Sequence, residues 1–167
     1  MSRLILLGNS SSGKSTLAAR LARGHDLGHL DLDTLAWAPT SPPVRKALDE
    51  SATALDAFVA ARDRWVIEGC YADLVELVLP RCTRLVFLDP GTDACVANAR
   101  ARPWEPHKYP SKQAQDANLE MLIDWIRAYE TRDDVFSRTA HRRLFDGFGG
   151  EKVVLERRDA IAVWDGV

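Results

Sequence analysis

The sequence predicts an α/β fold in which helices cover both faces of a five-stranded parallel sheet. Short apolar runs occupy residues 3–7, 29–32, 65–67, 85–88 and 152–155, and stretches with helical spacing of apolar residues separate them. Strands that alternate with helices build parallel sheets, and strands covered on both faces are apolar throughout. The first four runs end in glycine or acidic residues, which gathers these groups at one edge of the sheet.

The helices follow from apolar spacing and from residues that stop helices. In residues 15–23 leucine and alanine share one face, and Gly24 is expected to end this helix. Residues 44–62 are rich in alanine and leucine, and Pro80 is expected to stop a short helix over 71–79. Further helices are expected over 92–102, 113–131 and about 133–146, with a glycine-rich turn at 147–150.

Composition limits the kind of protein. The chain has 167 residues, 46% of them hydrophobic and 28% charged, which is typical of one globular domain spanning 1–167. A net charge of −2 lacks the basic character of nucleic-acid binders, so no direct nucleic-acid binding is expected. No run approaches the roughly 18 apolar residues of a membrane span. Three cysteines without CxxC spacing favour neither a disulfide framework nor a Cys-rich zinc site, and we expect a cytoplasmic protein without membrane partners.

A phosphate-binding motif follows the first strand. Its pattern, G-x-x-x-x-G-K-[ST], lies between a strand and a helix, which is the context that the motif requires. The glycines let backbone N–H groups turn toward phosphate, the lysine reaches the β- and γ-phosphates, and the last serine offers a hydroxyl to Mg²⁺. The expected nucleotide-binding residues are Gly8, Asn9, Ser10, Ser11, Ser12, Gly13, Lys14, Ser15 and Thr16.

Acidic residues end three of the other strands, where ligands of open parallel sheets bind. Asp31 and Asp33 are two residues apart, so on a strand they would project to the same side. Glu68 ends the third strand and Asp89 the fourth. Each acid could hold a metal-bound water, act as a base, or simply cap a helix or turn, and the sequence does not decide among them.

These segments resemble the P-loop small-molecule kinases, the group of adenylate, shikimate and gluconate kinases. The resemblance is greatest to the adenylate-kinase-like "DNA topology modulation" branch, through the phosphate loop and segments 29–37, 65–71 and 85–89. It implies a three-layer P-loop NTPase fold with strand order 2-3-1-4-5, ATP and Mg²⁺ as cofactors, and Ser15 and Asp33 at the metal. The arginine that adenylate kinases carry after the third strand is missing, which argues against AMP as acceptor. The glycine triplet of shikimate kinases is missing too.

A lid is expected over about residues 100–132. Pro103, Pro106 and Pro110 interrupt the helical pattern there, and basic residues flank the break. Lid arginines neutralise the charge of a phosphoryl group in transfer. The candidates are Arg100 and Arg132 as catalytic residues and Arg102 toward the nucleotide, with Arg127, Lys108 and Lys112 as further cations. Solvated helix charges are the alternative for all of them.

The leading hypothesis is an ATP-dependent, Mg²⁺-requiring phosphotransferase that moves the γ-phosphate to a small-molecule or nucleotide acceptor. Lys14, Asp33 and Glu68 join the lid arginines as its catalytic residues. Loop 34–46 and helix 44–62 would shape the acceptor pocket. The alternatives are a nucleotide-binding regulator that acts through DNA or a protein partner, and a plain ATPase. ATP, ADP and the acceptor are the expected partners, and the sequence leaves the oligomeric state open.

Overall fold

The computed structural model describes residues 2–167, which form one five-stranded parallel sheet and a small two-stranded ribbon. The sheet contains β1 (Arg3–Gly8), β2 (Gly28–Asp31), β5 (Trp65–Gly69), β6 (Arg84–Leu88) and β7 (Glu151–Leu155). Their spatial order is β2-β5-β1-β6-β7. Counted along the chain, this is 2-3-1-4-5, so the predicted order and the α/β class are confirmed. All four strand pairs are parallel.

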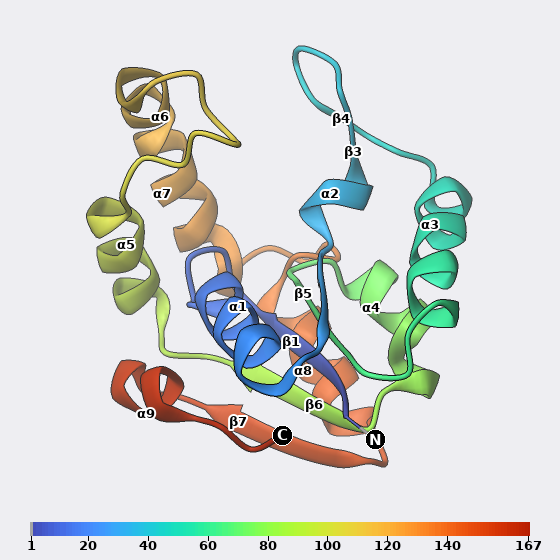
Figure 1. Cartoon of the computed structure of the whole chain (residues 1–167). Helices are drawn as coiled ribbons and strands as arrows, with labels where there is room; N and C mark the ends of the chain where they lie inside the picture. The colour runs from blue at the N-terminus through green and yellow to red at the C-terminus, as the bar shows by residue number, and fades with distance from the viewer. Residues whose placement is uncertain (1) are drawn as a thin grey trace.

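Alternate residues of the central strand pack on opposite faces of the sheet. Ile5 and Leu7 join the core under α3 (Leu48–Ala60), α4 (Ala72–Val78) and α8 (Arg138–Gly147). Leu4 and Leu6 join the core under α1 (Lys14–His25) and α9 (Arg158–Val163). Because both faces are covered, every residue of β5 is buried. The result is the three-layer arrangement seen in Figure 1.

Three helices and a 3₁₀ turn stand together beyond the carboxyl ends of the strands (Figure 1). They are α5 (Thr92–Ala101), α6 (Lys112–Ala117), α7 (Leu119–Arg127) and η2 (Ala128–Glu130). A separate apolar cluster around Cys95, Ala99 and Ile126 packs α5 against α7. Ser111 caps α6 by accepting a hydrogen bond from the Ala114 N–H at 3.0 Å.

Several helix boundaries differ from the sequence-based expectations. Helix α1 continues through Gly24 to His25 and ends where Asp26 adopts a left-handed conformation with φ 54°. Helix α4 ends at Val78, just before Pro80 as expected, and a 3₁₀ turn, η1 (Leu79–Arg81), follows, where the missing N–H of proline costs little. The segment expected over 113–131 is divided at Asn118 into α6 and α7. Helix α8 begins at Arg138 rather than 133, because the Ser137 side chain caps it there.

Two short strands and two short helices were not predicted. Strands β3 (Trp37–Ala38) and β4 (Val44–Arg45) pair in an antiparallel ribbon, so α3 begins at Leu48 and not at residue 44. A single helical turn, α2 (Asp33–Ala36), precedes this ribbon. Helix α9 follows the last strand and returns to α1. None of the helices within residues 2–167 combines the length and apolar character that a membrane crossing requires.

Candidate functional site

The loop between β1 and α1 has the backbone that its two glycines permit. Gly13 has φ 101°, a value that side chains with a Cβ rarely adopt. At Gly8 a Cβ would lie 2.3 Å from the Leu88 carbonyl oxygen, so only glycine fits beside β6. Among the described residues no side chain caps the start of α1. Its first N–H groups therefore face the loop, an arrangement that binds anions.

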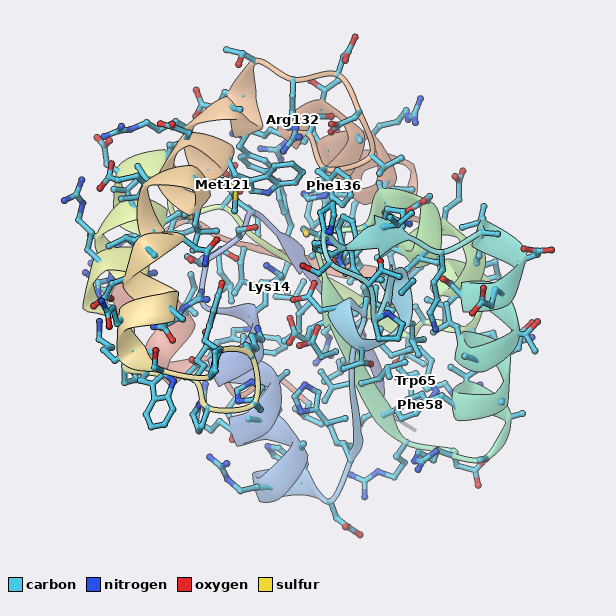
Figure 2. The ribbon with its side chains drawn as sticks, turned by 90° about the horizontal axis from the view of Figure 1, so that it is seen from above. Lys14, Phe58, Trp65, Met121, Arg132 and Phe136 are labelled. Atoms are coloured by element: carbon cyan, nitrogen blue, oxygen red, sulfur yellow. The ribbon has the colours of Figure 1, made fainter. Side chains whose placement is uncertain are left out.

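Lys14 lies beneath this loop. Its side chain is largely enclosed, with 7% of the residue exposed, and its Nζ donates a hydrogen bond to the Asn9 carbonyl oxygen at 2.6 Å. A cavity of about 550 Å³ opens over the loop from Ser11 to Ser15 and continues along α1 past Thr16. In the view from above, Lys14 is near the centre of the molecule (Figure 2). Gly8, Asn9 and Ser10 do not line the cavity.

Two acids stand side by side at the ends of β2 and β5, where Asp31 and Glu68 are register partners. Glu68 is 2% exposed, and its Oε1 has no hydrogen-bond partner among residues 2–167, with His29 Nε2 at 3.9 Å. Burial alone would raise the pKa of Glu68, but His29, Lys14 and Ser15 outweigh it and lower that pKa. Burial, with repulsion from Glu68, raises the pKa of Asp31 to about 6.

Asp33 does not continue the strand. Strand β2 ends at Asp31, whose Oδ1 accepts a hydrogen bond from the Asp33 N–H at 2.8 Å as the chain turns into α2. The expectation that strand alternation aligns these two acids is therefore wrong. Asp33 is instead held by Tyr71, whose hydroxyl donates to Asp33 Oδ1 at 2.5 Å and accepts from Trp37 Nε1 at 2.7 Å.

Asp89 is set apart from the other acids. Its buried carboxylate accepts hydrogen bonds from Arg138, the closest at 2.6 Å, and Arg142 lies 3.9 Å away. These bonds tie the end of β6 to α8. Asp89 is thus paired with arginines of α8, whereas Asp31 and Glu68 face each other across β2 and β5.

The three arginines predicted for the lid, Arg100, Arg102 and Arg132, lie in different places. Arg102 lines the cavity, and its Nη2 donates to Ser11 Oγ at 2.7 Å, whereas Arg100 is exposed and does not line it. Arg132 pairs with Asp134 at 2.9 Å, and its guanidinium stacks 3.6 Å from the Trp125 ring centroid. Arg132 lies beside Phe136 and apart from Lys14 in Figure 2. Of the three predicted arginines, one meets the phosphate loop.

Three residues near the cavity were missed or given little weight. Lys108 lines it and lies 3.8 Å from Asp33 Oδ2, joining the lid to the acids. Arg158 enters from α9, a helix of six residues that is too short for apolar spacing to predict. Asn98 also lines the cavity, and helical spacing from Arg102 could have placed it there.

A shelf of aromatic rings and arginines lies beside Asp33. The guanidinium carbon of Arg45 lies 4.9 Å from the Tyr71 ring centroid and 5.5 Å from that of Phe136. Arg45 Nη2 also pairs with Asp73 Oδ2 at 3.0 Å. Arg132 is also 5.5 Å from the Phe136 ring centroid, so the two guanidinium groups share this ring. We call Arg45, Tyr71, Trp125, Arg132 and Phe136 the aromatic shelf.

No protein-family model and no curated protein matches the chain. Solved structures do. A gluconokinase from Sinorhizobium meliloti 1021 is 16% identical with a TM-score of 0.57, over 96% of this chain and 85% of that one. A sugar kinase from Janibacter sp. HTCC2649 is 13% identical with a TM-score of 0.52, over 93% and 85%. A shikimate kinase from Bacteroides thetaiotaomicron is 20% identical with a TM-score of 0.46, over 87% and 97%. The chain therefore has a P-loop kinase-like fold.

Proposed function

We propose that this protein transfers the γ-phosphate of ATP to a hydroxyl group of a small molecule, and that it requires Mg²⁺. One observation supports this proposal most strongly. The cavity above the phosphate loop reaches Lys108, and Lys108 lies 3.8 Å from Asp33 Oδ2. A cation that lines the cavity is thus paired with Asp33, and an acceptor bound at Asp33 would meet the phosphoryl group there.

The nucleotide would be held by the loop. Backbone N–H groups from Ser11 to Ser15 and the start of α1 would bind the phosphates, with Thr16 next to them. Lys14 would exchange the Asn9 carbonyl for phosphate oxygens, and Arg102 would add charge from the lid. Segment 100–132 would act as a lid on a single domain.

The acidic residues fit a magnesium ion. Mg²⁺ favours one or two carboxylates together with phosphate oxygens and water. Glu68 Oε1 is buried without a hydrogen-bond partner among the described residues, and Asp31 stands beside it. The Ser15 hydroxyl and these carboxylates, with Asp33 through water, would hold the ion. Bound there, the ion would neutralise charge on the phosphates.

Asp33 is the residue that we assign to the acceptor hydroxyl. Tyr71 occupies Oδ1, which leaves Oδ2 to accept the proton as the hydroxyl attacks. The aromatic shelf lies beside it, and its arginines could bind an anionic group of the acceptor. The names of the structural neighbours put polyhydroxy acids and sugars first among the acceptors to test.

The proposal is tested by measuring ADP formation with ATP and Mg²⁺ over sugars, sugar acids, other hydroxy acids, nucleosides and nucleotides. We expect one class to stimulate turnover, and we expect Lys14→Ala to abolish it. Asp33→Asn should retain ATP binding and lose transfer. If no acceptor stimulates ADP formation and Lys14→Ala binds ATP normally, the phosphotransferase proposal fails. Acceptor-independent ADP release at a steady rate would indicate a plain ATPase.

A further inference from the structure

The phosphate loop is hydrogen-bonded to α5 and to the residue that follows it, where the chain enters the proposed lid. Asn98 Nδ2 donates to the Ser11 carbonyl oxygen at 2.8 Å, and Arg102 Nη2 donates to Ser11 Oγ at 2.7 Å. Ser11 has φ 60°, so it occupies a left-handed conformation that a non-glycine residue adopts at a cost. Asn98 of α5 and Arg102, the residue directly after this helix, therefore both hold the loop at Ser11.

The same loop is fastened to the returning helix, α7, by a different residue. Asn9 is 4% exposed, and its Nδ2 donates to the Ile126 carbonyl oxygen at 3.1 Å, near the C-terminus of α7. The main-chain carbonyl oxygen of Asn9 accepts a hydrogen bond from Lys14 Nζ. One residue thus contacts the cation of the loop with its main chain and the lid with its side chain.

The loop and the two helices form a junction with little room for independent movement. Cys95 and Ala99 of α5 pack against Ile126 of α7, the residue whose carbonyl Asn9 holds. If the loop moved without the two helices, the buried Asn9 amide would lose its partner, and an unpaired buried donor is destabilising. A change in the loop and a change in either helix are therefore linked energetically.

We propose that Asn9 and Asn98 are positioning residues that couple occupancy of the phosphate loop to the order of the two lid helices. The inference rests on the proposed nucleotide binding. A bound phosphate withdraws Lys14 from the Asn9 carbonyl and fixes the loop amides, and each asparagine passes that order to its own helix. Because coupling is reciprocal, order in either helix strengthens nucleotide binding by the same factor.

Amide hydrogen exchange of the full chain with and without saturating ADP and Mg²⁺ tests this inference. In the wild type, ADP should slow exchange in both α5 and α7 at least about fivefold, the lower range of typical couplings. Asn98→Ala should reduce the ADP-dependent slowing more in α5 than in α7, because the Arg102–Ser11 bond and the packing of α5 on α7 remain. Asn9→Ala should show the opposite pattern. Asn118→Ala is the matched control, since its amide bonds the Ala114 carbonyl within the lid and not the loop.

Each outcome decides. If ADP protects the loop but neither helix in the wild type, or if both variants keep full protection of both helices, the coupling is absent. If Asn98 only contacts nucleotide, Asn98→Ala weakens affinity but retains protection of α5 at saturation, which also overturns the proposal. A variant could exchange faster in all segments without ADP and still show the wild-type ratio of exchange rates with and without ADP. That result would mean lower stability with intact coupling, and it would also contradict the proposal. If ADP protects no part of the wild type, nucleotide binding itself fails, and this inference fails with it. No acceptor is needed, so a failed acceptor screen leaves this test intact.

Discussion

Lys108 Nζ lies 3.8 Å from Asp33 Oδ2, so the segment between α5 and α6 reaches the acid that we assign to the acceptor. Lys108 is also 3.8 Å from Glu105 Oε1, and Glu105 pairs with Arg102 at 3.2 Å. Arg102 in turn bonds Ser11 of the phosphate loop. A line of alternating charges therefore runs from the loop to Asp33.

Lys108→Met should lower kcat by about 100-fold, the usual loss when one charge-stabilising donor is removed from a transition state. ATP affinity should change less, because Lys14 and the loop amides remain. Lys112→Met is the matched control, since Lys112 pairs with Asp116 on the lid and does not line the cavity. Steady-state kinetics of the two variants decide the point. Equal kcat values for both would remove Lys108 from the mechanism.

Tyr71→Phe should lower kcat about tenfold with little change in ATP affinity. The Tyr71 hydroxyl positions Asp33 Oδ1 and accepts the indole N–H of Trp37, and both bonds disappear in the variant. Burial, reinforced by Asp33, raises the pKa of Tyr71, so the hydroxyl keeps its proton and donates at neutral pH. Unfolding in urea should show a loss of about 1–3 kcal/mol. A variant with unchanged kcat and lower stability would limit Tyr71 to a structural role.

Arg158→Met should weaken ATP binding about threefold to tenfold, the effect of losing one partly exposed charge near a polyphosphate or base. Arg158 lines the cavity from α9. This helix lies against the phosphate loop, since a Cβ added at Gly13 would be 3.4 Å from Ile161. Arg157→Met is a control one residue away, because Arg157 is exposed and pairs with Asp159. Calorimetric titration with ATP compares the two. Equal affinities would place Arg158 outside the nucleotide site.

The sheet was predictable because its signal is local. Each of the three central strands, β1, β5 and β6, contains a continuous apolar run, and burial on both faces requires that pattern in the strand itself. The edge strands β2 and β7 are less buried, and their signal is weaker. The ribbon of β3 and β4 has two residues per strand, too few for a period to appear. Helix α9 has six residues, less than two helical turns, and its packing against α1 depends on the finished fold.

The site divides in the same way. The phosphate loop is one contiguous motif, so its residues could be proposed from the sequence alone. The contacts of Asp33 with Tyr71 and Lys108 join three elements that only the fold brings together. Arg132 has the residue type and the position of a lid arginine, yet stacking on Trp125 and pairing with Asp134 turn it to the aromatic shelf. The sequence can identify a basic residue as a candidate for phosphate binding. Whether its side chain faces the phosphate loop depends on contacts that the sequence does not reveal.

His141 provides a pH-dependent measure of stability. It is fully buried between the Cys70 carbonyl oxygen, 2.8 Å from Nε2, and the Tyr129 hydroxyl, 2.9 Å from Nδ1. Burial lowers its pKa to about 4, and the Cys70 carbonyl opposes this only in part. The folded chain therefore keeps His141 neutral where the unfolded chain, with a pKa near 6.5, takes up a proton.

The sign of the pH effect follows from this difference in proton binding. The contribution of neutral His141 is fully present above about pH 6.5 and is lost as the pH falls toward 4, with a limiting slope of about 1.4 kcal/mol per pH unit. Urea denaturation of the wild type between pH 7 and pH 4 should show this decline. His141→Gln should be less stable at pH 7, because it disturbs the buried contacts with Cys70 and Tyr129. Because glutamine does not titrate, its free energy of unfolding should decline less steeply as the pH falls. Parallel curves for the two proteins would mean that other groups cause the pH dependence.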